Sequence, residues 1–469
     1  MAKFTSISAF FAPRDMTTGT PWKRMLNFCL PMLVGNIFQQ LYNTVDAVVV
    51  GHYIGDNALA AVGSAGPLVM VMIALFFSIA SGVGIMVAQY FGAKQREELS
   101  QTIGCCLTVM TIAALFISVA APPFIRPGLE LLGTPPEILD WCAEYVRILI
   151  WGSIGMAYYN IISGILRGLG DAVSSLLYLI VASLLNVALD ILFVSQFHMG
   201  VAGVAWATII AQAVSGLLCL RRLMRLRDVF ELKRSHLYPS KRHLKQILHL
   251  GLPTGISQVI NSLAMMMVQS LANTFGAAFV ACNVIVMRVD SFVMMPVFTF
   301  GAVMMTYTGQ NVGAQRQDRV QEGLRQCLIL ALSVCVFAIG VVLLFGQYLM
   351  MLFTDTTEII EMSMHMMRIM AAGYLGISIG QIFLGLLRGA GETVMPMWIT
   401  TISSVGIRIP LAYLLVYLTT SEAYPIGSPD SLFISLAIAW ISGAVMSFWA
   451  YKRGKWRKKG LVQAAPQEA

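Results

Sequence analysis

The sequence has 469 residues, of which 57% are hydrophobic and 12% charged, and its formal net charge is +8. Soluble domains are about 25% charged and 45–50% apolar, so this composition excludes an ordinary soluble fold. The apolar runs reach roughly 20 residues without strict alternation, which predicts membrane-spanning helices and not a β-barrel.

A polar and mixed segment, residues 1–24, precedes the first apolar run, and we predict that it is cytoplasmic. No signal peptide is expected, because the first apolar run exceeds an h-region of about 7–15 residues. An N-terminal lobe of six helices, residues 25–220, is predicted to follow. Its helices are expected near residues 25–50, 58–89, 99–121, 139–165, 174–197 and 200–220.

A basic stretch at residues 221–246 is predicted to be a cytoplasmic linker. A C-terminal lobe of six helices, residues 247–451, and a basic cytoplasmic tail, residues 452–469, complete the predicted chain. The helices of this second lobe are expected near residues 247–274, 278–309, 323–345, 362–387, 394–419 and 431–451.

The basic residues are distributed unevenly between the predicted loops. The linker and the tail contain dense runs of Lys and Arg, whereas the loops predicted to lie outside contain only Arg126. Such asymmetry is typical of cytoplasmic loops, so both termini are predicted to be cytoplasmic. The net charge is therefore a topology signal, and no nucleic-acid partner is expected.

The two lobes carry related sequences at a constant offset of 221 residues. The most specific match pairs Gly164–Asp171 (GILRGLGD) with Gly385–Glu392 (GLLRGAGE). Each lobe has an even number of spans, so both enter the membrane from the same face and are expected to enclose a cavity where they meet. We predict an all-α polytopic membrane protein with about 12 transmembrane helices in two pseudo-symmetric six-helix bundles around a central cavity.

The first predicted span carries a polar face. Asn36, Gln39, Asn43 and Asp46 recur every three or four residues, which places them on one side of a helix. A polar face on a membrane helix must contact protein or water, and an ionisable residue there is a candidate functional group. We predict that Asn36, Gln39 and Asn43 line a substrate cavity.

A second carboxylate, Asp190, lies in the fifth span one turn beyond Asn186, and Thr208 follows in the sixth span. Counting residues from the outer ends of these helices places Asp190, Thr208 and Asp46 at similar depth in the membrane. Two carboxylates, an amide and a hydroxyl can bind a small cation or share a proton. The alternative that these groups only satisfy one another structurally stays open.

The second lobe lacks this set, because Met267 or Val268 occupies the position that matches Asp46. Gln258 and Asn261 keep the seventh span polar, and we predict that they line the substrate cavity. Asp290, in the eighth span, either contacts substrate or pairs with Arg288.

Eight cysteines are scattered along the chain without a CxxC pair or a Cys/His cluster. Neither disulfides nor a metal site is expected, other than a Na⁺ bound by Asp46, Asn186, Asp190 and Thr208. No nucleotide-binding motif or nucleophile constellation is present, so we predict no catalytic residues, no cofactor and no enzymatic activity.

These motifs together resemble the multidrug and toxic compound extrusion (MATE) family. The resemblance covers about residues 22 to 451. The motifs that carry it are Leu30–Pro31, Gln39, Asn43, Asp46, Val50–Gly51, the paired Leu-Arg-Gly turns, Gln89–Ala93, Asn186-x-x-x-Asp190 and Ala205–Thr208.

Members of the MATE family are two bundles of six helices that export organic cations in exchange for Na⁺ or H⁺. The resemblance implies that Asp46, Asn186, Asp190 and Thr208 form the coupling-ion site. One branch of the family has carboxylates in the seventh and tenth spans, but here Asn261 takes the seventh-span position and the tenth span has none. The chain therefore resembles the DinF-like branch.

We expect a secondary active transporter that exports organic cations or drugs in antiport with H⁺ or Na⁺ by alternating access. It is expected to be a monomer in the lipid bilayer of the cell (plasma or inner) membrane, with a cationic amphiphilic small molecule as substrate. Two alternatives stay open. A lipid-linked sugar or oligosaccharide flippase of the same superfamily would favour a strongly cationic cavity, and a non-transporting receptor or scaffold would be expected to carry a sizeable soluble domain.

Overall fold

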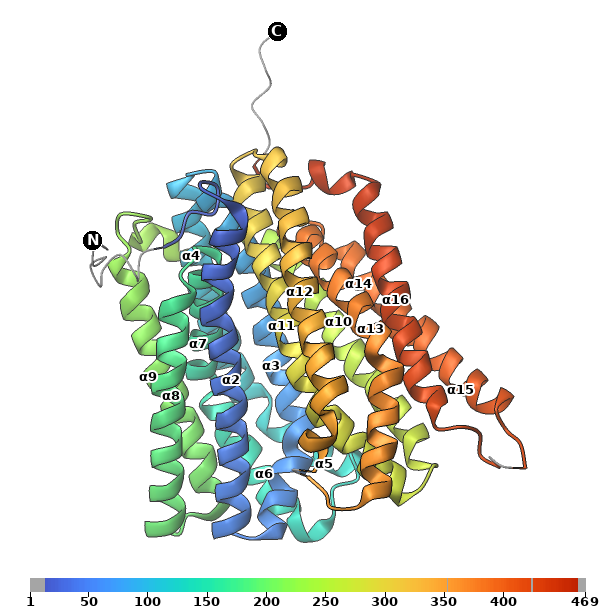
Figure 1. Cartoon of the computed structure of the whole chain (residues 1–469). Helices are drawn as coiled ribbons and strands as arrows, with labels where there is room; N and C mark the ends of the chain where they lie inside the picture. The colour runs from blue at the N-terminus through green and yellow to red at the C-terminus, as the bar shows by residue number, and fades with distance from the viewer. Residues whose placement is uncertain (1–12, 352, 423–424, 463–469) are drawn as a thin grey trace, which may run out of the picture. The chain divides into compact units, whose positions relative to one another are not determined.

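The computed structural model describes residues 13–351, 353–422 and 425–462, and every regular element within them is a helix (Figure 1). The first half contains α2 (Pro21–Tyr53), α3 (Asp56–Gly92), α4 (Arg96–Ala120), α5 (Pro122–Leu131), α6 (Pro136–Trp151), α7 (Ser153–Gly168), α8 (Ala172–Ile191), η1 (Leu192–Gln196), α9 (Gly200–Arg225) and η2 (Arg234–Leu237). The second half contains α10 (Lys241–Asn273), α11 (Ala277–Gly313), α12 (Gln317–Met350), α13 (Thr357–Gly389), α14 (Val394–Thr401), η3 (Ile402–Ile407), α15 (Arg408–Leu418), α16 (Asp430–Lys452) and η4 (Lys455–Lys458).

The helices reproduce the predicted spans. Among the described residues, nine helical segments are long and apolar enough to cross a membrane, and the bent pair α6 and α7 makes a tenth. Helices α2 and α10, each 33 residues long, lie at the predicted first and seventh spans but are not among these ten segments. Large apolar side chains such as Phe337 and Leu344 are 73% and 75% exposed, as lipid-facing residues would be. The protein is a multi-pass α-helical membrane protein.

The fourth predicted span is not one straight helix. Helices α6 and α7 are bent by 55° relative to each other. Gly152 lies at the break, and a Cβ atom added to it would come within 2.3 Å of the Ile209 side chain on α9. The close approach of α9 therefore requires glycine at the bend, a long-range requirement that the pattern of apolar residues did not predict.

The chain forms two compact units whose limits differ from those of the predicted lobes. Unit 1 contains the described residues up to Asp15 together with Leu30–Gly255, and unit 2 contains Met16–Cys29 together with the described residues from Ile256 onward. The predicted linker and the first part of α10 thus belong to unit 1, whereas the first part of α2 belongs to unit 2.

The linker packs on α4 within unit 1. Nε2 of His236 lies 2.9 Å from Oε1 of Glu97, and Nε2 of His243 lies 3.0 Å from Oε2 of Glu98. Arg242 also donates a hydrogen bond of 3.1 Å to Glu98. Both histidines are buried, so this segment is a folded part of unit 1 and not an extended tether.

The paired Leu-Arg-Gly turns have the same backbone geometry. Gly170 and Gly391 have φ angles of +83° and +92°, values that glycine adopts without strain. The amide of the next residue, Asp171 or Glu392, donates to the carbonyl five residues earlier at 2.8 and 2.9 Å. These bonds satisfy carbonyls at the end of α7 and α13, so the glycines provide the helix exit that their sequence predicts.

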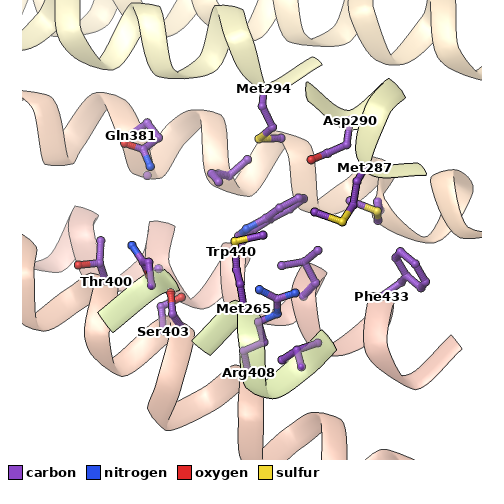
Figure 2. Close-up of a pocket in the computed structure, with 18 of the residues that line it drawn as sticks. Met265, Met287, Asp290, Met294, Gln381, Thr400, Ser403, Arg408, Phe433 and Trp440 are labelled. Atoms are coloured by element: carbon purple, nitrogen blue, oxygen red, sulfur yellow. The ribbon is translucent and has the colours of Figure 1, made fainter. Parts of the chain in front are cut away.

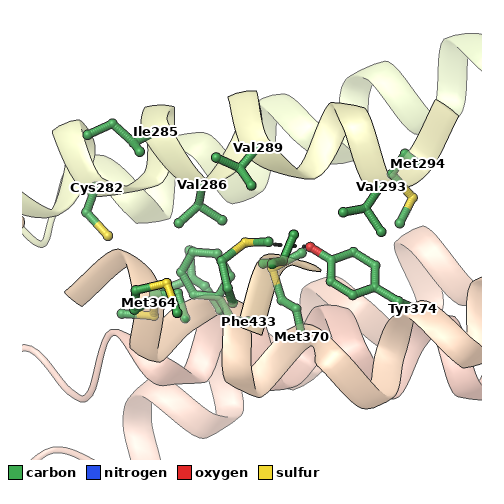
Figure 3. Packing of buried hydrophobic residues seen from close by; sticks show 14 of the residues in the cluster. Cys282, Ile285, Val286, Val289, Val293, Met294, Met364, Met370, Tyr374 and Phe433 are labelled. Carbon is green, nitrogen blue, oxygen red and sulfur yellow. Dashed lines mark hydrogen bonds between the residues drawn. The ribbon is translucent and has the colours of Figure 1, made fainter. Parts of the chain in front are cut away.

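The apolar core of unit 2 lies between α11, α13 and α16 (Figure 3). Tyr374 of α13 lies at one end of this cluster, where its hydroxyl donates to the sulfur of Met367 at 3.7 Å. Labelled members of the cluster in Figure 3 are Cys282, Ile285, Val286, Val289, Val293, Met294, Met364, Met370, Tyr374 and Phe433.

Contact between α11 and α13 depends on Gly385. A Cβ atom added there would lie 2.2 Å from the backbone oxygen of Gly301, which cannot rotate away. Gly385→Ala is therefore expected to destabilise the protein by about 1–3 kcal/mol. Gly340→Ala on α12 is the control, because an added Cβ atom meets nothing within 4 Å there. Thermal unfolding in one detergent measures both variants, and equal midpoints would contradict the close approach.

Candidate functional site

The polar face predicted for the first span is present on α2. Gln39 donates a hydrogen bond of 3.5 Å to Asn43 through their side-chain amides. Asn36 and Asn43 are exposed, whereas Asp46 is partly buried. The face therefore ends in a carboxylate that is partly removed from solvent.

Asp46 of α2 and Asp190 of α8 adjoin each other in unit 1, and their carboxyl groups interact directly. Asp190 is 0% exposed. Neither oxygen of Asp190, nor Oδ1 of Asp46, receives a hydrogen bond from a donor group. Two adjacent buried carboxylates repel when both are charged, and a proton or small cation held between them removes that repulsion.

Asn186 and Thr208 extend this oxygen set. Nδ2 of Asn186 donates to Oγ1 of Thr208 at 3.5 Å, while the Thr208 hydroxyl donates to the Val204 carbonyl at 2.9 Å. Oδ1 of Asn186 is buried and receives no hydrogen bond. The amide oxygen and the carboxylates therefore offer acceptor oxygens that no protein donor satisfies, as a hard-cation or proton site would.

Two tyrosines lie beside the cluster formed by Asp46, Asp190, Asn186 and Thr208, and neither was predicted. The Tyr42 side chain of α2 lies beside Asp46 and Thr208. Tyr145 of α6 lies near both carboxylates. Tyr42 precedes Asp46 by four residues, so helical spacing could have indicated it. Tyr145 has no such signal, because only the packing of α6 places it there.

Apolar residues surround one side of the cluster. Tyr145 packs against a buried group made of Val50, Ala58, Val194, Val201 and Val204. Just after Asp190 the helix continues as η1, a π-helical turn of the kind that often marks functional sites. Electrostatic interactions with the carboxylates are strengthened because this surrounding has a low dielectric constant.

Unit 2 contains a cavity of about 450 Å³ (Figure 2). Gln258, Asn261 and Asp290 line it, whereas the other candidates for a substrate cavity, Asn36, Gln39 and Asn43, are not among its lining residues. Its apolar lining includes the side chains of Met265, Met287, Met294, Met370, Phe433 and Trp440. The lining thus combines flexible thioethers and aromatic rings with a few polar groups, which is typical of small-molecule sites.

Asp290 does not pair with Arg288. Arg288 is exposed, whereas Asp290 interacts with the Tyr374 hydroxyl and, through its charge, with Arg408. Of the two roles left open for Asp290, its position in the cavity wall fits contact with a ligand. Arg408 was not among the candidate residues predicted from the sequence.

A comparison with protein families matches the MatE description to residues 31–192 and again to residues 253–414. The chain belongs to the MatE family. The two successive matches agree with the internal repeat found in the sequence. Because members of the MatE family are transporters, this protein is a transporter and not an enzyme.

Relatives of the chain cover most or nearly all of its length. It is 28% identical to the Probable multidrug resistance protein YoeA of Bacillus subtilis, over 94% of this chain and 96% of the relative. It is also 28% identical to the DNA damage-inducible protein F of Escherichia coli, over 73% and 74% of the two chains. These relatives agree with the resemblance to the MATE family and its DinF-like branch.

The fold is also that of solved MatE family structures. A structure described as the outward-facing conformation of a multidrug resistance MATE family transporter of the MOP superfamily superposes with a TM-score of 0.87 at 26% identity. The superposition covers 98% of this chain and 100% of the other. The predicted all-α architecture is therefore confirmed.

Proposed function

We propose that the protein exports organic cations from the cell in antiport with H⁺ or Na⁺, in an alternating-access cycle. The adjoining carboxylates of Asp46 and Asp190 carry this proposal, because both oxygens of Asp190 and Oδ1 of Asp46 are buried without a hydrogen-bond partner. Asn186 and Thr208 complete the proposed ion site, and Tyr42 orients it. Both this site and the unit 2 cavity lie within one chain, so we infer that a monomer is the transporting unit.

Exchange requires negative coupling between ion and substrate. A ligand shifts a conformational equilibrium only by its differential affinity for the two states, and coupling between two ligands is reciprocal. An ion bound by Asp46 and Asp190 in the outward-facing state would favour the state that releases a cationic substrate. Release of the ion into the cytoplasm would restore the charge that favours substrate binding.

The cavity in unit 2 is the proposed substrate site. Its volume of about 450 Å³ falls within the range of about 300–1,000 Å³ that is usual for drug-sized ligands. Methionine side chains can repack around ligands of different shape. The relatives named as multidrug resistance proteins support a drug-like substrate for this chain.

Transport in proteoliposomes tests the proposal. The protein is reconstituted with a fluorescent organic cation, rhodamine 123, and ΔpH and ΔNa⁺ are imposed separately at zero membrane potential. One of the two gradients should drive uptake of the dye against its concentration gradient. Equal dye movement with either gradient and with neither would refute ion-coupled antiport.

We also propose that both termini lie in the cytoplasm, in keeping with the distribution of Lys and Arg. All eight cysteines of the chain are buried, so we expect little reaction of these thiols with a maleimide. Leu131→Cys, at a site 90% exposed, should react in intact cells with a membrane-impermeant maleimide. Lys459→Cys should react only after permeabilisation, and equal labelling of both sites would overturn the topology.

The flippase alternative is not favoured by the cavity. A pyrophosphate-linked cargo would require several cationic groups, but Arg408 is accompanied in the lining by the carboxylate of Asp290. The proposed ion site likewise presents two acids to its surroundings.

A further inference from the structure

The unit 2 cavity presents two opposite charges that do not neutralise each other in an ion pair. Asp290 comes from α11 and Arg408 is the first residue of α15, and both line the cavity (Figure 2). They are near enough to interact through their charges, yet no ion pair joins them among the described residues. The cavity wall therefore has a separate anionic point and cationic point.

Each of the two groups retains an unsatisfied atom. Oδ1 of Asp290 and Nε of Arg408 are buried and have no hydrogen-bond partner. Buried polar atoms in folded proteins are almost always paired, so an unpaired acceptor and an unpaired donor in one cavity indicate a ligand that supplies both partners. A pair with a purely structural role would be expected to satisfy these atoms by direct contact.

The backbone just before Arg408 is a π-helical turn and not a regular α-helix. Helix α14 ends at Thr401, and the π-helical turn η3 (Ile402–Ile407) leads directly into Arg408. Ser403, in this turn, also lines the cavity and donates to the Ala439 carbonyl. Such turns change the direction of the side chains that follow them and occur often at functional sites.

The two side chains are complementary to a ligand that carries one positive and one negative charge. A guanidinium binds a carboxylate in preference to an amine, and the Asp290 carboxylate binds a cationic nitrogen. Between them Trp440 and the methionines supply an apolar surface for the body of the ligand. A simple cation would satisfy Asp290 and leave the Nε atom of Arg408 without a partner.

We propose that this cavity selects zwitterionic amphiphiles, that is, organic cations that also carry a carboxylate. The cationic group is placed at Asp290 and the carboxylate at Arg408. This inference rests on the proposed function of the cavity as the substrate site, and it narrows the substrate class from organic cations in general.

Equilibrium binding of two matched dyes tests this selectivity. Rhodamine 110 carries a free carboxylate, and rhodamine 123 is its methyl ester, so the pair differs in a single negative charge. Binding is measured by fluorescence anisotropy with the full chain in nanodiscs at neutral pH, without any ion gradient. The wild-type protein should bind rhodamine 110 about tenfold more tightly than rhodamine 123, as expected for one added hydrogen bond to a charged group.

Variants assign this preference to the two residues. Arg408→Gln should weaken the binding of rhodamine 110 about tenfold and change that of rhodamine 123 by less than about threefold. Asp290→Asn should weaken the binding of both dyes, and Arg408→Lys should retain part of the preference. Arg368→Gln on α13 is the control, because this arginine is exposed and lies outside the cavity lining. Monodispersity and thermal unfolding confirm that each variant is folded.

Three results would overturn the inference: equal affinity of the wild type for both dyes, an equal loss for both dyes in Arg408→Gln, or binding of neither dye. The outcome is separable from that of the antiport proposal. A preserved preference without gradient-driven transport would refute antiport alone, whereas transport without the preference would refute only the zwitterion selectivity.

Discussion

Asp46→Asn is expected to abolish ion-driven export while leaving membrane insertion near normal. Asparagine preserves the size of the side chain and mimics the neutral carboxyl group, so it removes the charge that would bind and release the ion. The gradient-stimulated rate should fall at least about tenfold, which corresponds to about 1.4 kcal/mol in activation free energy. The measurement is dye-stimulated ion efflux from proteoliposomes at matched protein content.

Substitutions of the other residues of the proposed ion site are expected to reduce exchange to different extents. Asp190→Asn should impair exchange as strongly as Asp46→Asn, because the two carboxylates adjoin. Thr208→Ala should cost less, about fivefold or below, since it removes one neutral hydroxyl. Asp56→Asn, at an exposed position at the start of α3, is the matched control and should transport normally. If Asp46→Asn retains wild-type gradient-dependent exchange, the carboxylate pair is structural and the coupling role is wrong.

Asp171→Ala is expected to be among the most destabilising single substitutions in unit 1. The Asp171 carboxylate is 2% exposed, caps α8 by accepting from the Ser174 amide at 3.0 Å, and forms an ion pair of 2.9 Å with Arg222. Alanine would remove both the cap and the negative charge that the partly buried arginine faces. The expected loss is about 3–5 kcal/mol, the range for breaking a buried ion pair, and it should appear as a lower unfolding midpoint.

Two further variants separate the cap from the ion pair. Asp171→Asn should retain much of the cap, because asparagine is a good N-cap residue, and should lose only the charge. Asp140→Ala removes an acid that is also ion-paired, to Arg126 at 3.1 Å, but is 80% exposed, so its effect should stay below about 1 kcal/mol. Equal midpoints for Asp171→Ala and Asp140→Ala would show that burial of the pair adds nothing.

The sequence predicted the four polar residues of the proposed ion site, but not the residues around them. Asp46, Asn186, Asp190 and Thr208 are rare polar residues in apolar spans, and residue counts placed them at one depth before the structure brought them together. Their role in coupling stays a prediction. Tyr145 could not be predicted in the same way, because its approach depends on how α6 packs.

In unit 2, too, only some of the residues that line the cavity could be predicted from the sequence. Gln258, Asn261 and Asp290 were predicted from polarity and do line one cavity. Arg408 was not predicted, because the π-helical turn that precedes it has no simple sequence signature. Helical period predicts which face of a regular helix a residue occupies, and it fails where the period itself changes.

The exchange of segments between the two units also constrains how the chain can fold during synthesis. Arg319 of unit 2 donates to the carbonyls of Met16 and Gly19, about three hundred positions earlier, and the Met16 amide donates to Gln310. These partners leave the ribosome first, and Arg319 and Gln310 cannot reach them until most of the chain has been made. At translation rates of about 5–20 residues per second, Met16–Cys29 is made roughly 15–60 seconds before the part of unit 2 against which it packs.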